Sequence, residues 1–164
     1  MQAAVADTSP LRYMVLIGAI EVLPRLFESV IVPDGVHAEL CHARAPAMVR
    51  GWADAAPAWL VIISDPSVED ADLRLLDAGE RAAIALAMTM QPAPILIDDR
   101  AGVSAARAKG LEVFGTLGLL ERAARGGLID LHSALATLQA TNFHALPELY
   151  ERLLARDRVW RGGA

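Results

Sequence analysis

Short apolar runs alternate along the chain with longer segments in which apolar residues recur every three or four positions. The runs lie at 3–6, 30–32, 59–63, 95–97 and 111–114. Most of them are rich in β-branched residues and stop at or near proline, glycine or acidic residues, which is typical of buried strands. The intervening periodicity is that of amphipathic helices. The pattern therefore predicts strands that alternate with helices.

Start and stop signals divide the intervening segments into separate helices. Pro10 suits the first turn of a helix capped by Thr8 or Ser9, and glycines at 110 and 126–127 end two later helices. Helices are predicted at about 11–20, 21–27, 36–41, 45–53, 77–90, 101–109, 116–125, 130–137 and 147–157.

Strands separated by helices imply right-handed crossovers and a central parallel sheet flanked by helices. The predicted class is α/β, with one domain over 1–158 and a disordered tail at 159–164. The last predicted helix carries leucines at near-helical spacing. This apolar face, made by Leu146, Leu149, Leu153 and Leu154, fits either the core or a dimer interface.

Composition narrows the kind of protein. The chain has 164 residues, 54% of them apolar and 21% charged, which is the balance of a compact soluble domain. Its net charge of −5 excludes a generally basic nucleic-acid coat. The single cysteine, Cys41, excludes an internal disulfide framework. Because no stretch reaches the ~20 apolar residues of a membrane span, we expect a cytoplasmic protein without membrane contacts.

The charges are unevenly distributed. Residues 1–99 contain 6 arginines and 14 acidic residues, whereas residues 100–164 contain 9 basic and 6 acidic residues. The asymmetry is compatible with an acidic site beside a basic surface, and equally with ordinary solvated faces.

Carboxylates gather at the ends of predicted strands. Asp7 and the pair Asp98-Asp99 each close an apolar run, and Glu39 and Glu80 lie on helices that begin after a strand. Because the carboxyl ends of parallel strands share one edge of the sheet, these side chains are expected to converge. Converging carboxylates repel one another unless a hard cation lies between them, and an all-oxygen donor set favours Mg²⁺ or Mn²⁺ over zinc.

Each of these carboxylates also has an ordinary structural interpretation. Asp7 fits a helix N-cap, Glu80 fits a partner of the helix dipole, and Glu39 fits a solvated helix position. His37 and Cys41 have helical spacing and His42 follows, but a transition-metal site needs three or four ligands and the other histidines are far away in the sequence.

Five motifs, in order along residues 3–130, resemble those of PIN domains. They are Asp7-Thr8-Ser9-Pro10-Leu11, Val36-His37-Ala38-Glu39-Leu40, Leu76 through Ala87, Leu96-Ile97-Asp98-Asp99-Arg100 and Gly115-Thr116-Leu117-Gly118. More narrowly, the chain resembles the uncharacterised prokaryotic PIN-like proteins of the DUF3368 type, which are related to VapC toxins.

The resemblance implies a ribonuclease that depends on Mg²⁺ or Mn²⁺. It assigns catalysis and metal binding to Asp7, Glu39, Glu80 and Asp99. It assigns metal binding to Asp98 as well. The chain has Ile97-Asp98-Asp99 where the family often has Thr-x-Asp, so either aspartate fits the inner ligand, and Glu80 stands where aspartate is more usual. Ser9 and Thr116 would be hydroxyls that orient ligands or water.

The resemblance also implies partners. Basic residues that follow the acidic pair would contact RNA phosphates, namely Arg100, Arg107, Lys109 and Arg122. A toxin of this kind pairs with a small antitoxin protein that blocks the acidic crevice, and PIN domains commonly form homodimers.

Two other interpretations of the sequence stay open. One is a receiver-like or phosphatase-like Mg²⁺ domain, although a receiver would place its acidic pair on the first strand rather than after residues 95–97. The other is a PIN-like module that binds RNA or a protein without cleaving it. Glu80 and the altered fourth motif are the features that keep the second interpretation open.

Overall fold

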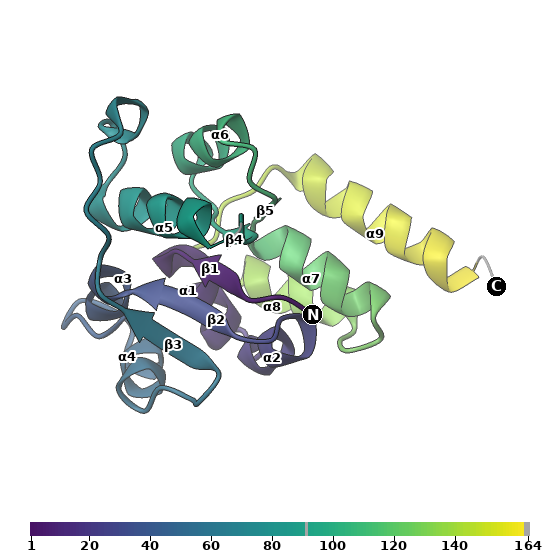
Figure 1. Ribbon diagram of the computed structural model, residues 1–164. Coiled ribbons are helices and arrows are strands. Elements are labelled where there is room, and N and C mark those ends of the chain that lie inside the picture. Colours follow the sequence, from purple (N-terminus) through teal and green to yellow (C-terminus); the bar gives the residue numbers. More distant parts are fainter. Residues whose placement is uncertain (91, 163–164) are drawn as a thin grey trace.

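The computed structural model describes residues 1–90 and 92–162. At its centre is a sheet whose strands all pair in parallel, in the order β3-β2-β1-β4-β5 (Figure 1). The strands are β1 (Ala4–Ala6), β2 (Val30–Pro33), β3 (Leu60–Ile63), β4 (Ile95–Leu96) and β5 (Val113–Phe114). The predicted α/β class and parallel sheet are confirmed.

Every segment predicted to be helical contains a helix. The helices are α1 (Thr8–Leu16), α2 (Leu23–Leu26), α3 (Asp34–Leu40), α4 (Ala47–Asp54), α5 (Ala78–Thr89), α6 (Arg100–Ala108), α7 (Thr116–Arg125), α8 (Leu131–Gln139) and α9 (Pro147–Gly162), with short 3₁₀ turns at Ile20–Val22 and Ala71–Leu73. The first helix ends at Leu16 rather than near 20, because Gly18 has a φ of +72°, a left-handed conformation that stops a helix.

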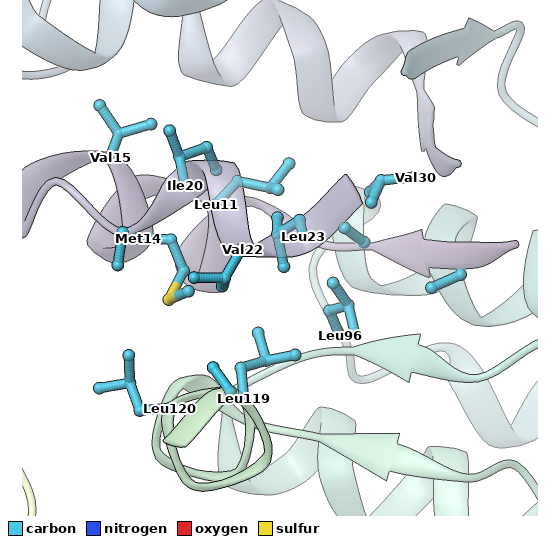
Figure 2. Packing of buried hydrophobic residues seen from close by; sticks show 14 of the residues in the cluster. Leu11, Met14, Val15, Ile20, Val22, Leu23, Val30, Leu96, Leu119 and Leu120 are labelled. Atoms are coloured by element: carbon cyan, nitrogen blue, oxygen red, sulfur yellow. The ribbon is translucent and has the colours of Figure 1, made fainter. Parts of the chain in front are cut away.

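Alternate side chains of the strands enter two separate cores. Val5, Ile31 and Ile95 point toward α5 and α6, where they pack with Ile84 and Ala106. The other strand face packs against the remaining helices and forms the larger core. Figure 2 shows this cluster, in which Leu11, Met14, Leu23, Leu96, Leu119 and Leu120 interlock. The sheet is thus covered on both faces, as predicted. Strands β1, β2 and β4 are buried, whereas Val61 and Ile62 of the edge strand β3 are 40% and 41% exposed.

The strand order places a crevice between β1 and β4. From β1 the chain passes to β2 and β3 on one side, while β4 and β5 lie on the other side. Connections that depart in opposite directions leave an open crevice at the carboxyl ends of the two central strands. The backbone N–H of Asp7 donates to the carbonyl of Leu96 at 2.9 Å, so the ends of β1 and β4 lie side by side.

The C-terminal helix packs as part of the core. Leu153 is only 2% exposed, whereas Leu146, just before α9, is 72% exposed. The helix also extends to Gly162, beyond the predicted end near Asp157. In its last turns, Arg161 pairs with Asp157 at 2.9 Å and with Asp130 at 3.2 Å. Residues 159–162 of the expected tail are therefore helical, and residues 163–164 lie outside the described residues.

Over the described ranges, no helix is both long enough and apolar enough to cross a membrane.

The packing of α9 predicts a difference between two leucines. Leu153→Ala should lower the free energy of unfolding by about 2–4 kcal/mol, because it leaves a cavity in the core. Leu146→Ala removes the same atoms from an exposed position and should change the free energy of unfolding by less than about 0.5 kcal/mol. Urea unfolding of both variants measures the difference. Equal effects would mean that α9 does not pack as described.

Candidate active site

The five predicted carboxylates line one cavity of about 380 Å³ at the carboxyl edge of the sheet. Asp7 follows β1, and Asp98 and Asp99 follow β4, while Glu39 lies near the end of α3 and Glu80 in the first turn of α5. The cavity thus lies at the crevice between β1 and β4. The expected convergence is present in the structure.

A sixth carboxylate, Asp77, lines the same cavity. Three of the acids surround Gly79: a Cβ added there would lie 3.3 Å from Oδ1 of Asp7 and 3.5 Å from both Oδ1 of Asp77 and Oε2 of Glu39. Asp77 is not among the carboxylates expected from the sequence, where an aspartate just before a helix is typical of an N-cap. It is the N-cap of α5 and accepts the N–H of Glu80 at 2.8 Å.

Asp7 does not act as a capping side chain. It occupies the N-cap position of α1, but its carboxylate makes no capping hydrogen bond. The residue is 6% exposed. Burial, opposed by the Thr8 backbone N–H and reinforced by the charges of Asp77, Glu80 and Glu39, raises the pKa of Asp7 to about 7. The ordinary interpretation of this residue therefore does not explain its placement.

Glu80 has both a structural and an electrostatic role. Its carboxylate accepts the Asp77 N–H at 3.3 Å, which completes a capping box at the start of α5. The residue is also 6% exposed. Burial first, then the negative charges of Asp77 and Asp99, raise the pKa of Glu80 to about 7. Capping holds the side chain at the cavity without neutralising its charge.

The acidic pair after β4 divides into two roles. Asp98 accepts hydrogen bonds from Ser9 Oγ at 3.0 Å, from Thr116 N at 2.7 Å and from Thr116 Oγ1 at 2.6 Å. Burial raises the pKa of Asp98, and these three donors oppose the rise. Asp99 instead caps α6 through the N–H groups of residues 101 and 102 and faces Glu80.

The hydroxyls predicted to orient ligands do contact carboxylates. Ser9 and Thr116 both donate to Asp98, and Thr8, which was not among the predicted hydroxyls, donates to Glu39. The Asp98 contacts tie β4 to the first turns of α1 and α7. The Thr8 contact ties α1 to α3.

The donor set fits a hard divalent cation. It consists of carboxylate oxygens, two of the acids are buried with raised pKa values, and within residues 1–90 and 92–162 none of the six carboxylates takes part in an ion pair with a basic side chain. In the same ranges, no group of three His, Cys, Asp or Glu side chains is drawn together closely enough to hold a metal ion as it stands. Exposed Glu39, Asp77 and Asp99 would have to turn inward to complete a ligand set.

A further wall of the cavity comes from α1 and the segment between α8 and α9. Tyr13 packs edge-to-face on Phe143 with ring centroids 4.9 Å apart, and its hydroxyl donates to Asn142 Oδ1 at 2.9 Å. Arg12 and His144 also line the cavity. No signal in the sequence marks this wall, because its two parts lie about 130 positions apart and carry no motif.

None of the basic residues predicted to contact RNA lines the acidic cavity. Lys109 pairs with Asp70 at 2.6 Å and with Asp72 at 3.0 Å. The guanidinium of Arg122 lies over the rings of Phe27 and Phe114, 5.6 and 5.0 Å from their centroids. Arg100 begins α6 at the edge of the site, whereas Arg107 lies near the far end of the same helix.

The raised pKa values predict how stability depends on pH. In the folded state Asp7 and Glu80 hold their protons up to about pH 7, against ordinary values of 3.8 and 4.5. The metal-free protein should therefore lose stability as the pH rises from about 4 to about 7. Asp7→Asn should raise the free energy of unfolding by about 1–3 kcal/mol at pH 8 in EDTA and change it little at pH 4.5.

Urea unfolding at the two pH values measures this effect. Asp72→Asn serves as the control, because Asp72 is 79% exposed and lies outside the cavity, and its partner Lys109 keeps the shorter ion pair with Asp70. A destabilised Asp7→Asn variant at pH 8 would show that the ionised Asp7 carboxylate costs the metal-free fold no free energy.

Comparison with known proteins agrees with the motifs. A family model described as a PIN domain (DUF3368) matches residues 3–158, which is almost the whole chain. A search among curated proteins and another among solved structures found no match. PIN domains are generally nucleases that use divalent metal ions. The chain belongs to the PIN domain family.

Proposed function

We propose that this protein is a ribonuclease that hydrolyses phosphodiester bonds with Mg²⁺ or Mn²⁺ bound in the acidic cavity. The observation that carries the proposal is the crowding around Gly79, where oxygens of Asp7, Asp77 and Glu39 lie within 3.5 Å of one point. Such crowding at a strand switch point destabilises the metal-free fold and is relieved by a divalent cation.

The proposed roles follow from the contacts of each side chain. Asp7, Glu39, Glu80 and Asp99 would be the catalytic carboxylates that hold the cation, and Asp77 adds a further oxygen beside them. Asp98, already held by Ser9 and Thr116, would position the end of β4 and form an outer part of the ligand set. When bound, the cation supplies a Lewis acid that activates water and stabilises charge on the phosphodiester.

The biological setting proposed is that of a cytoplasmic toxin in a toxin–antitoxin pair. The support is the likeness of the five motifs to those of PIN-like proteins related to VapC toxins. In this setting a small antitoxin protein covers the acidic cavity, and the chain acts as a homodimer that cuts within RNA strands.

One observation favours a second candidate function. Because no three potential ligands of the described residues are already arranged around a metal position, a PIN-like module that binds RNA without cleaving it is the alternative. The two functions differ in whether RNA is cut and whether binding needs the cation.

Filling the space at Gly79 tests the metal site without a change of charge. Gly79→Ala places a methyl group among the three carboxylate oxygens and should weaken Mn²⁺ binding about tenfold or more. The variant should keep the fold, because the contact at 3.3 Å requires the Asp7 side chain to shift by only a few tenths of an ångström. Gly51→Ala is the control, since an added Cβ meets nothing within 4 Å there.

Calorimetric titration with Mn²⁺ gives the affinities of both variants. Unchanged affinity in Gly79→Ala would show that the oxygens around Gly79 do not bind the metal, and would remove the observation that carries the proposal.

Cleavage of a panel of structured and single-stranded RNAs tests the activity. Cutting should require Mn²⁺ or Mg²⁺, stop in EDTA and fall by about 100-fold or more in Asp7→Asn, Glu80→Gln and Asp99→Asn, which each remove a ligand. Asp72→Asn should retain full activity. Absence of cutting together with metal-independent RNA binding would favour the non-catalytic module, and cutting that survives EDTA would contradict both.

A further inference from the structure

A second cavity, of about 360 Å³, adjoins the acidic one. The two cavities share Thr8, Arg12 and Glu39. The second cavity lies between α1, the end of α3 and the turn that leads to α4, where it is lined by His42 and Arg44. It therefore brings basic groups next to a crowded set of carboxylates.

The guanidinium of Arg12 has a buried N–H group without a hydrogen-bond acceptor. Its Nε atom is buried and has no hydrogen-bond partner, and within residues 1–90 and 92–162 no ion pair involves its guanidinium. The guanidinium carbon lies 5.5 Å from the centroid of the Tyr13 ring. Buried N–H groups without a partner are rare and costly, and they call for an explanation such as a bound ligand.

His42 and Arg44 are presented by a hydrogen-bonded turn. The Arg44 backbone N–H donates to His42 Nδ1 at 3.0 Å, and the Ala45 N–H donates to the His42 carbonyl at 2.9 Å. Because Nδ1 accepts, the ring carries its proton on Nε2, which is free to donate to a ligand. In the described part of the chain, Arg44 also takes part in no ion pair.

Glu39, the shared carboxylate, is directed toward the acidic side. Its Oε2 atom accepts from the Thr8 hydroxyl and is the same atom that lies 3.5 Å from the Cβ position of Gly79. The negative charge of Glu39 is thereby held with Asp7 and Asp77. The second cavity keeps the two arginines and the histidine as its main polar groups.

We propose that Arg12, His42 and Arg44 form a subsite for a backbone phosphate of the nucleic acid, next to the phosphodiester at the acidic cavity. The adjacency to a cleaved phosphodiester rests on the proposed function. Arginine binds phosphate oxygens through paired N–H donors, and such contacts fix the path of a strand without reading its sequence. The subsite also offsets the repulsion that a chain of net charge −5 exerts on a polyanion.

The subsite gives the nucleic-acid strand a path to the acidic cavity. The basic residues that the sequence predicts to contact RNA do not give such a path. Lys109 and Arg122 are engaged by carboxylates and aromatic rings away from the cavity. Arg12 lines both cavities, so a strand that crosses it passes from the basic cavity directly to the carboxylates.

Binding of a fluorescently labelled single-stranded RNA in EDTA, measured by anisotropy over a range of salt, tests the proposal without cleavage. The double variant Arg12→Gln/Arg44→Gln should bind about tenfold or more weakly. Its slope of log affinity against log salt should be smaller by about 0.7 for each phosphate that the variant no longer neutralises. Arg152→Gln/Arg158→Gln, the same charge change at exposed positions of α9, should bind as the wild type does.

Two further arms separate the outcomes. Arg44→Gln alone changes an exposed side chain and should fold as the wild type does while binding RNA more weakly, which guards against misfolding of the double variant. A polyglutamate peptide of matched length should bind weakly and equally to all variants. Peptide binding that disappears in the double variant while RNA binding is kept would make this a carboxylate site and overturn the proposal.

Failure of the phosphate subsite can be distinguished from failure of the proposed ribonuclease function. RNA affinity that is equal in the wild type and both double variants overturns the phosphate subsite, even if metal-dependent cleavage is observed. Weaker RNA binding in Arg12→Gln/Arg44→Gln, in a protein that cuts no RNA, supports the subsite and removes the ribonuclease.

Discussion

Burial of carboxylates at the carboxyl ends of β1 and β4, where further acids repel them, is the constraint on which the organisation of this site depends. Asp7 and Glu80 are buried beside Asp77, Glu39 and Asp99, and their pKa values rise to about 7. A fold that only needed stability would not place these groups together, because each charged carboxylate removed from water without a partner costs free energy. The arrangement makes physical sense when a divalent cation supplies the missing positive charge.

The rest of the site holds the carboxylates at that position. The buried strands bring Asp7 and the Asp98-Asp99 pair to one edge, and the capping box fixes Glu80 at the start of α5. Asp98 differs from its neighbours, because three donors from α1 and α7 satisfy it. The site thus contains two kinds of carboxylate. Asp98 holds neighbouring elements of the fold in place, and the others lack cationic partners among the described residues. Arg12, whose buried Nε has no hydrogen-bond partner, lines the same cavity and supplies a positive charge beside these carboxylates.

The sequence predicts what depends on local pattern and on the geometry of parallel sheets. The strands, the class of fold and the convergence of Asp7, Glu39, Glu80, Asp98 and Asp99 all follow, because strands in parallel end at a common edge. Contacts between distant segments have no such signature. Tyr13 and Asn142 meet across 129 positions, and Lys109 pairs with Asp70 and Asp72 on a turn that follows β3. Asp77 has no signal beyond its place just before a helix, which is typical of an N-cap.

The most direct test of a divalent cation in the acidic cavity is anomalous diffraction from crystals grown with Mn²⁺. An anomalous peak is expected about 2 Å from carboxylate oxygens that include Asp7 and at least one of Glu80 and Asp99. A well-ordered cavity without such a peak, in crystals whose solution holds Mn²⁺ well above physiological levels, would contradict the proposed site. So would a peak confined to acidic residues outside this cavity, such as Asp34 and Asp65.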